Sequence, residues 1–248
     1  MAATAYHYTE RHEHDFDVEK GAALNAFAER TVRQGFVKKV FGLLAAQLAL
    51  TTLIAGAIVL SSTVKAFVAA NPWVFMLSFV VSFSIILSFT FSTTARQSHP
   101  LNLVLLFAFT AAEGVLVGAA SAQVSTDIVL LALGITAGIT AGMCLYALTT
   151  KHDITMAGSF LYAGLMALIF ASLAGFFLKT SAFNMLVSGG GAVLFSVYIA
   201  YDVQMLLGGE HKFAVSPDDY VMGTIAIYLD IINLFLHILR LLSSNNRE

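Results

Sequence analysis

Residues 227–242 read IYLDIINLFLHILRLL, an apolar stretch suited to lipid that carries an aspartate, Asp230, in its interior. A carboxylate near the centre of a bilayer costs about 2.5–3.5 kcal/mol on insertion scales, so such a group is usually kept for a reason. The stretch therefore predicts a membrane-spanning helix with one acidic side chain whose presence needs an explanation from the rest of the chain.

The composition extends this interpretation to the whole chain. Of the 248 residues, 58% are hydrophobic and 11% are charged, whereas soluble domains carry about 25% charged residues. Runs of helix-span length recur, and they are too long for the strands of a membrane barrel. We expect an all-α integral membrane protein with seven transmembrane helices, near residues 36–61, 72–93, 101–122, 127–149, 155–178, 183–207 and 220–242.

Polar segments flank these spans and suggest an orientation. We expect a flexible cytoplasmic tail over residues 1–35, the membrane domain over 36–242 and a short C-terminal tail over 243–248. Cytoplasmic loops carry an excess of Lys and Arg. A cytoplasmic N-terminus puts seven basic residues inside and four outside, and it places the C-terminus on the opposite side unless the last helix fails to cross. The inside set is Arg30, Arg33, Lys38, Lys39, Arg96, Lys151 and Lys212, and the outside set is Lys65, Lys179, Arg240 and Arg247.

Glycines suggest a helix end and two packing surfaces. Gly208 stands where the sixth span should end, as the C-cap of a helix commonly does. In the fourth span Gly134, Gly138 and Gly142 recur every four residues, which predicts a close helix neighbour. The run Gly-Gly-Gly at 189–191 lacks the lysine of a phosphate loop and also predicts packing.

Ionisable residues within the spans are the candidates for chemistry, and the acids among them are Glu113, Asp202 and Asp230. At 100° per residue, the last helix carries one narrow small or polar stripe and a broad apolar remainder. Such a stripe is typical of a helix that lines an internal path or a polar core. The stripe consists of Gly223, Ala226, Asp230, Asn233, His237 and Arg240.

Hydrogen bonding between helices would explain Asn233 or His237 alone. It explains an aspartate less well, because asparagine would join helices without the cost of charging. If Asp202 and Asp230 meet across the sixth and seventh spans, they titrate as a coupled pair. Such a pair is a candidate proton-sensitive gate and, when ionised, a ligand for Ca²⁺, which favours hard oxygen atoms. Arg96, at the end of the second span, is the candidate counter-charge of a latch.

Three stretches carry a resemblance to a known family: HPLNLVLLFAFTAAEG at 99–114, YD-x-Q at 201–204 and SPDDYVMGTIAIYLDIINLFLHILRLL at 216–242. They resemble the transmembrane BAX inhibitor motif family, most closely its Lifeguard or Golgi anti-apoptotic branch. The resemblance implies seven helices with the last one central and surrounded by the other six. It also implies a pH-sensitive Ca²⁺ leak from the Golgi, endoplasmic reticulum or bacterial cytoplasmic membrane, and suppression of cell death in animal and plant members.

The same resemblance assigns roles to particular positions. The paired aspartates of the family match Asp202 and Asp230, and its latch arginine matches Arg96. Asp218 matches an acidic position linked to ion passage in the Golgi branch. Independently of the resemblance, their positions within the spans make Glu113, Asn233 and His237 secondary candidates along an ion path.

The expected partners are the lipid bilayer, Ca²⁺ and protons, and, by the resemblance, membrane proteins of cell-death signalling. We expect a monomer with no cofactor, Ca²⁺ being the permeant ion. The resemblance points to the Golgi or the endoplasmic reticulum, and a net charge of -2 argues against a nucleic-acid partner.

Other functional classes compete with the channel. Tyr201-Asp202 fits the first motif of intramembrane aspartyl proteases, but Gly-x-Gly-Asp and Pro-Ala-Leu are absent, as are metal- and serine-hydrolase motifs. An enzyme is therefore not expected. A non-conducting regulatory protein acting through membrane partners and a proton-coupled carrier remain open.

Overall fold

The structure is a computed structural model that describes residues 2–178, 180–208 and 215–245, with side chains described for Glu29 and, within these ranges, from Thr31 to Ser244. These ranges contain helices and no strand. The helices are α1 (Ala2–Leu60), α2 (Ser62–Ala70), α3 (Pro72–Phe91), α4 (Thr93–Gln97), α5 (Leu101–Ser121), α6 (Thr126–Thr149), η1 (Ile154–Ala157), α7 (Gly158–Ala174), α8 (Ser181–Leu207), η2 (Pro217–Asp219) and α9 (Tyr220–Asn245).

Seven segments of the described ranges are long and apolar enough to cross a membrane, and each predicted span overlaps one of them. In such helices every backbone hydrogen bond is made within the segment, which hydrocarbon requires. The predicted class and number of spans are confirmed, and the chain is a multi-pass membrane protein. The segments are Thr31–Leu60, Pro72–Phe91, Leu101–Ser121, Thr126–Thr149, Ile154–Ala174, Ser181–Leu207 and Pro217–Ser244.

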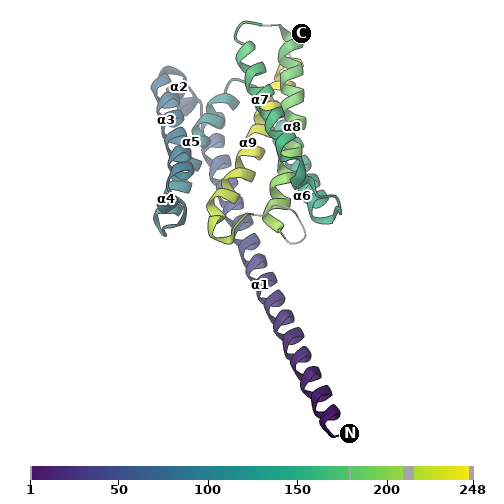
Figure 1. Ribbon diagram of the computed structural model, residues 1–248. Helices are drawn as coiled ribbons and strands as arrows, with labels where there is room; N and C mark the ends of the chain where they lie inside the picture. The colour runs from purple at the N-terminus through teal and green to yellow at the C-terminus, as the bar shows by residue number, and fades with distance from the viewer. Residues whose placement is uncertain (1, 179, 209–214, 246–248) are drawn as a thin grey trace.

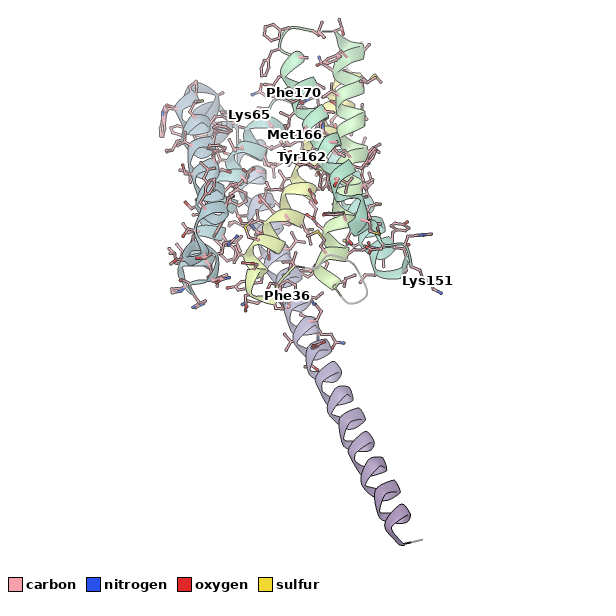
Figure 2. The ribbon with its side chains drawn as sticks, in the orientation of Figure 1. Phe36, Lys65, Lys151, Tyr162, Met166 and Phe170 are labelled. Carbon is pink, nitrogen blue, oxygen red and sulfur yellow. The ribbon has the colours of Figure 1, made fainter. Side chains whose placement is uncertain are left out.

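Helix α9 occupies the centre of the bundle. It packs against α8, α6, α1 and α5, and Figure 1 shows it with α3 and α5 on one side and α6, α7 and α8 on the other. Of its most apolar window, 56% is buried, compared with 39% for α5, the next highest share. The outer helices instead present apolar side chains to lipid, as Tyr162 and Phe170 do on α7 (Figure 2). The expected central position of the last helix is confirmed.

The polar N-terminal segment continues the first span as helix. Helix α1 begins at Ala2, and its first half projects away from the bundle (Figure 1). The boundary expected near residue 36 therefore falls inside a helix, and Phe36, 5% exposed, marks where that helix enters the bundle (Figure 2). Residues 18–34, VEKGAALNAFAERTVRQ, are rich in Ala, Glu, Leu and Arg, which favour helix, so helix propagates outward from the span. The segment expected as a flexible tail is thus helical, and its flexibility stays a prediction.

The two ends of the bundle agree with the predicted topology. Helix α1 enters at one end and α9 finishes at the other (Figure 1), so the last helix crosses the bundle. Lys65 and Lys151, predicted on opposite sides, lie toward opposite ends in Figure 2. Helix α9 runs to Asn245, so the first part of the expected C-terminal tail is helical. Which end faces the cytoplasm stays a prediction, and Lys179, Lys212 and Arg247 of the charge count lie outside the described residues.

The glycine stripe of the fourth span does not meet a helix. A Cβ added at Gly134, Gly138 or Gly142 would find no atom within 4 Å, and all three residues are exposed on α6. The predicted packing there is wrong. The close approach occurs instead at Gly118 of α5, where an added Cβ would lie 3.0 Å from the Cα of Ala55 on α1.

Gly208 ends α8 as predicted. Its φ of 61° is the left-handed conformation that favours glycine, and its N–H donates to the Gln204 carbonyl, 3.1 Å away. Close by, Nη1 of Arg33 on α1 donates to the Val215 carbonyl at 2.7 Å. This bond ties the entry of α1 to the segment that leads into α9.

Candidate functional site

Two carboxyl groups, one buried and one half-buried, meet where α8 packs along α9. The side chains of Asp202 on α8 and Asp230 on α9 share a hydrogen bond. Asp230 is 6% exposed and Asp202 is half-buried. A hydrogen bond between two carboxyl groups needs one proton, so this arrangement holds a proton between the helices. Oδ2 of Asp230 has no hydrogen-bond partner among the described residues, which leaves it able to accept a proton or a cation.

The glutamine two residues after Asp202 fixes the neighbouring loop. Gln204 is fully buried; its Oε1 accepts from the backbone N–H of Ile154 at 2.7 Å, and its Nε2 donates to the carbonyl of His152 at 2.9 Å. Tyr201 contributes on the same helix, because its hydroxyl would lie 2.7 Å from a Cβ added at Gly158. Residues 201–204 therefore hold the connection between α6 and α7 against α8, next to the aspartate pair.

The polar stripe on α9 also contacts α8 at His237, about two helical turns beyond Asp230. The His237 ring stacks on Phe195 of α8, with ring centroids 5.7 Å apart and planes at 25°, and it lies against Gly191. Its Nδ1 is buried and has no hydrogen-bond partner among the described residues. Asn233, by contrast, donates to the Leu229 carbonyl of its own helix at 2.8 Å. Of these two secondary candidates, His237 is the one seen to contact α8.

Arg96 pairs with a different acid from the one expected. Its Nε lies 3.7 Å from Oδ1 of Asp219, too far for a hydrogen bond, and the two side chains are 24% and 30% exposed. Arg96 sits on α4 at the end of the bundle where α9 starts. Asp230 lies about 15 Å further along α9, from the helical rise per residue. In this structure the counter-charge of Arg96 is therefore Asp219, not the aspartate pair.

Asp218, predicted from the resemblance, lies in η2 before α9. It is exposed, and its backbone N–H donates to the Ser216 Oγ at 3.4 Å, which caps the short helix. The carboxylate that meets Arg96 belongs to the next residue, Asp219. The consecutive acids after Pro217 were visible in the sequence, but their separate orientations were not.

Glu113 belongs to another polar cluster, on a different side of α9. Ser82 of α3 donates to Oε1 of Glu113 on α5. The fully buried Tyr228 of α9 shares a hydrogen bond of 2.8 Å with Thr51 of α1. Tyr228 and Asp230 are two residues apart, so they point to nearly opposite sides of α9. Glu113 lies near enough to Tyr228 to interact with it electrostatically, so it is on the side of α9 away from the aspartate pair. No group of three or more His, Cys, Asp or Glu suited to a metal ion was found in the described parts of the chain.

The profile of the Bax1-I family, described as Inhibitor of apoptosis-promoting Bax1, matches residues 33–247. The chain belongs to this family. The match covers all seven spans and includes both aspartates of the pair.

Relatives of this Bax1-I protein share about a third of its residues. It is 34% identical over 223 residues to Protein lifeguard 4 of Mus musculus, which covers 90% of both chains. It is 33% identical over 223 residues to the Golgi anti-apoptotic protein of Vaccinia virus (strain Lister), covering 90% of this chain and 91% of the relative. Bax inhibitor 1 of Schizosaccharomyces pombe is 34% identical over 214 residues, covering 86% and 77% respectively. None of these names is that of an enzyme.

Sequence reasoning missed several residues that organise the site of this Bax1-I protein. Asp219 lay beside the predicted acid. Ser82 is one of several serines in the second span and Thr51 has a threonine beside it, so the sequence singled out neither. Gln204 could have been found, because a glutamine deep in an apolar span must place both its donor and its acceptor.

Proposed function

We propose that this protein is a pH-sensitive leak path for Ca²⁺ across an intracellular membrane, and that Asp202 and Asp230 form its gate. The observation that carries the proposal is the hydrogen-bonded carboxyl pair between α8 and the central helix α9. A proton shared by two helices joins them, and its loss leaves two like charges that repel. The pair can therefore couple proton binding to the packing of α8 on α9.

The ligand chemistry supports a passing ion better than a resident one. Ca²⁺ takes about 6–8 oxygen ligands. The pair supplies four carboxylate oxygens at most, and no third acidic or histidine ligand was found to join it in the described residues. Weak, incomplete coordination lets a permeant ion leave as well as enter.

A second candidate is a regulator that suppresses cell death through membrane-protein partners without conducting ions. The names of two relatives, Golgi anti-apoptotic protein and Bax inhibitor 1, favour this role. By the same comparison we propose that the protein suppresses apoptosis and resides in the Golgi. The family resemblance adds the endoplasmic reticulum as an alternative membrane, and the distribution of Lys and Arg favours a cytoplasmic N-terminus. Both candidates can be true of one protein.

The test is Ca²⁺ flux into liposomes that hold the purified protein, between about pH 5 and pH 9. Wild type is expected to leak Ca²⁺ with a several-fold change across this range. Asp202→Asn with Asp230→Asn is expected to flatten the pH dependence, because asparagine keeps the shape of the pair but binds no proton in this range. Asp127→Asn is the matched control, since Asp127 is exposed at the start of α6.

Three results would separate the candidates. Absence of flux from folded wild type at every pH would refute the leak path. If Asp127→Asn flattened the pH dependence of the Ca²⁺ flux as much as the double variant does, Asp202 and Asp230 would not be the gate. In cells, a double variant that loses flux but keeps protection from cell death would favour the regulatory role.

A further inference from the structure

The ring of helices around α9 has a gap between α1 and α6. Both helices pack on α9, but extensive packing between the two is not found in the described residues. A groove with a volume of about 710 Å³ lies in this gap, and residues of α1, α5, α6 and α9 line it. Ile231 and Ile232 of α9, next to Asp230, belong to that lining. The central helix can therefore be reached from outside the bundle at this point.

This groove opens toward lipid. Leu53 of α1 and Leu130 of α6 line it and are 71% and 61% exposed. They lie within membrane-spanning segments, so the medium outside them is hydrocarbon. The lining is almost wholly apolar, and an apolar cavity does not hold ordered water. The molecule that occupies this part of the groove must therefore be apolar too.

One end of the groove is polar. Ser61 follows α1, Ser121 ends α5 and Thr126 begins α6, so these three lining residues share the end of the bundle opposite the entry of α1. Ser121 is 1% exposed, and its Oγ has no hydrogen-bond partner among the described residues. A buried hydroxyl without a partner is costly, which points to an acceptor supplied by a ligand.

We propose that this groove binds one acyl chain of a membrane phospholipid, with the Ser121 hydroxyl donating to the ester carbonyl of that chain. The volume lies within the range of about 300–1,000 Å³ typical of small-molecule sites. The polar end also lies where the ester region of a leaflet would lie, with the apolar depth directed toward the bilayer centre.

Photolabelling tests the proposal on the full chain. The protein is placed in vesicles of phosphatidylcholine in which a small fraction carries a diazirine on one acyl chain, then irradiated and mapped by mass spectrometry. Adducts are expected on Ile231 and Ile232 of α9 as well as on Leu53 and Leu130. The α9 adducts are diagnostic, because an otherwise enclosed helix meets few lipids.

Two variants sharpen the test. Gly56 lines the groove, and a Cβ added there meets no atom within 4 Å, so Gly56→Leu should place a side chain in the groove, narrow it and lower the α9 adducts several-fold. Gly138→Leu is the matched control, because Gly138 also has open space but lies outside the lining. Ser121→Ala adds no bulk and should lower the α9 adducts through loss of the hydrogen bond.

Adducts spread evenly over the outer helices with none on α9 would mean annular lipid only and would overturn the proposal. In a further variant, a photoreactive amino acid replaces Leu53. Cross-links from this position to a second copy of the chain would overturn the proposal, because the groove would then be a contact between copies. If Gly56→Leu fails to fold, the wild-type map and Ser121→Ala still decide. None of these results depends on ion flux, so the leak path and the lipid site can fail separately.

Discussion

At the scale of single residues, Gly191 is the position that lets the His237 ring lie against α8. A Cβ added at Gly191 would overlap that ring, whereas one added at Gly190 would meet nothing within 4 Å. Both glycines lie within a helix, where replacement by alanine favours folding by about 0.5–1 kcal/mol when space allows. The two neighbours thus differ in the space around them and little else.

We expect Gly191→Ala to lower the free energy of unfolding by about 1–3 kcal/mol relative to Gly190→Ala, because the ring must leave its stacking position on Phe195. Thermal unfolding of the two purified variants in detergent measures the difference. Equal melting temperatures would show that His237 moves aside without cost.

Also at this scale, the sequence predicted the aspartate pair but not the partner of Arg96. The cost of charge in hydrocarbon marked Asp202 and Asp230 as candidates, and the family resemblance implied that the two pair. An arginine at a helix end has long reach and several acids nearby, so its choice of Asp219 depends on where η2 places that residue.

At the scale of helices, the contact between α1 and α5 depends on glycine. Gly114 and Gly118 of α5 stand four residues apart, and Ile54 and Ile58 of α1 fill the space above them. This is the spacing that lets two membrane helices approach closely. The same spacing at Gly134, Gly138 and Gly142 meets no helix, so spacing alone does not identify a helix contact.

Gly118→Ala is expected to destabilise the protein by about 1–3 kcal/mol, because the new Cβ would lie 2.6 Å from Cδ1 of Ile58 and 3.0 Å from the Ala55 backbone. Gly138→Ala is the control and is expected to leave stability unchanged or to raise it by up to about 1 kcal/mol. Unfolding of both variants under the same denaturant conditions provides the comparison. A stabilising Gly118→Ala would contradict the close approach of α1 and α5.

At the scale of the whole molecule, the topology places loops at two ends of one bundle. Lys65, in α2, and Lys151, after α6, lie toward opposite ends in Figure 2. Cytoplasmic loops carry the excess of Lys and Arg. Lys151 belongs to the predicted set of seven basic residues and Lys65 to the set of four, so Lys151 is expected on the cytoplasmic side and Lys65 on the other.

A membrane-impermeant maleimide should therefore label Lys151→Cys from the cytoplasmic side of sealed vesicles and Lys65→Cys only from the other. The half-buried Cys144 is replaced by alanine in both variants to remove its background. Labelling of both positions from the same side would mean that the bundle does not cross the membrane as described.

The sequence by itself determined the class of this protein, its seven spans and their order, and the presence of an aspartate inside each of the last two spans. Hydrocarbon length and the cost of charge act locally, so they can be read from a run of residues. Tertiary structure alone decided which glycines pack, which acid meets Arg96, that Glu113 lies apart from the aspartate pair, and that α1 and α6 leave a groove onto α9. These outcomes depend on how helices are rotated and spaced around the centre, and such packing is set by contacts between residues far apart in the chain.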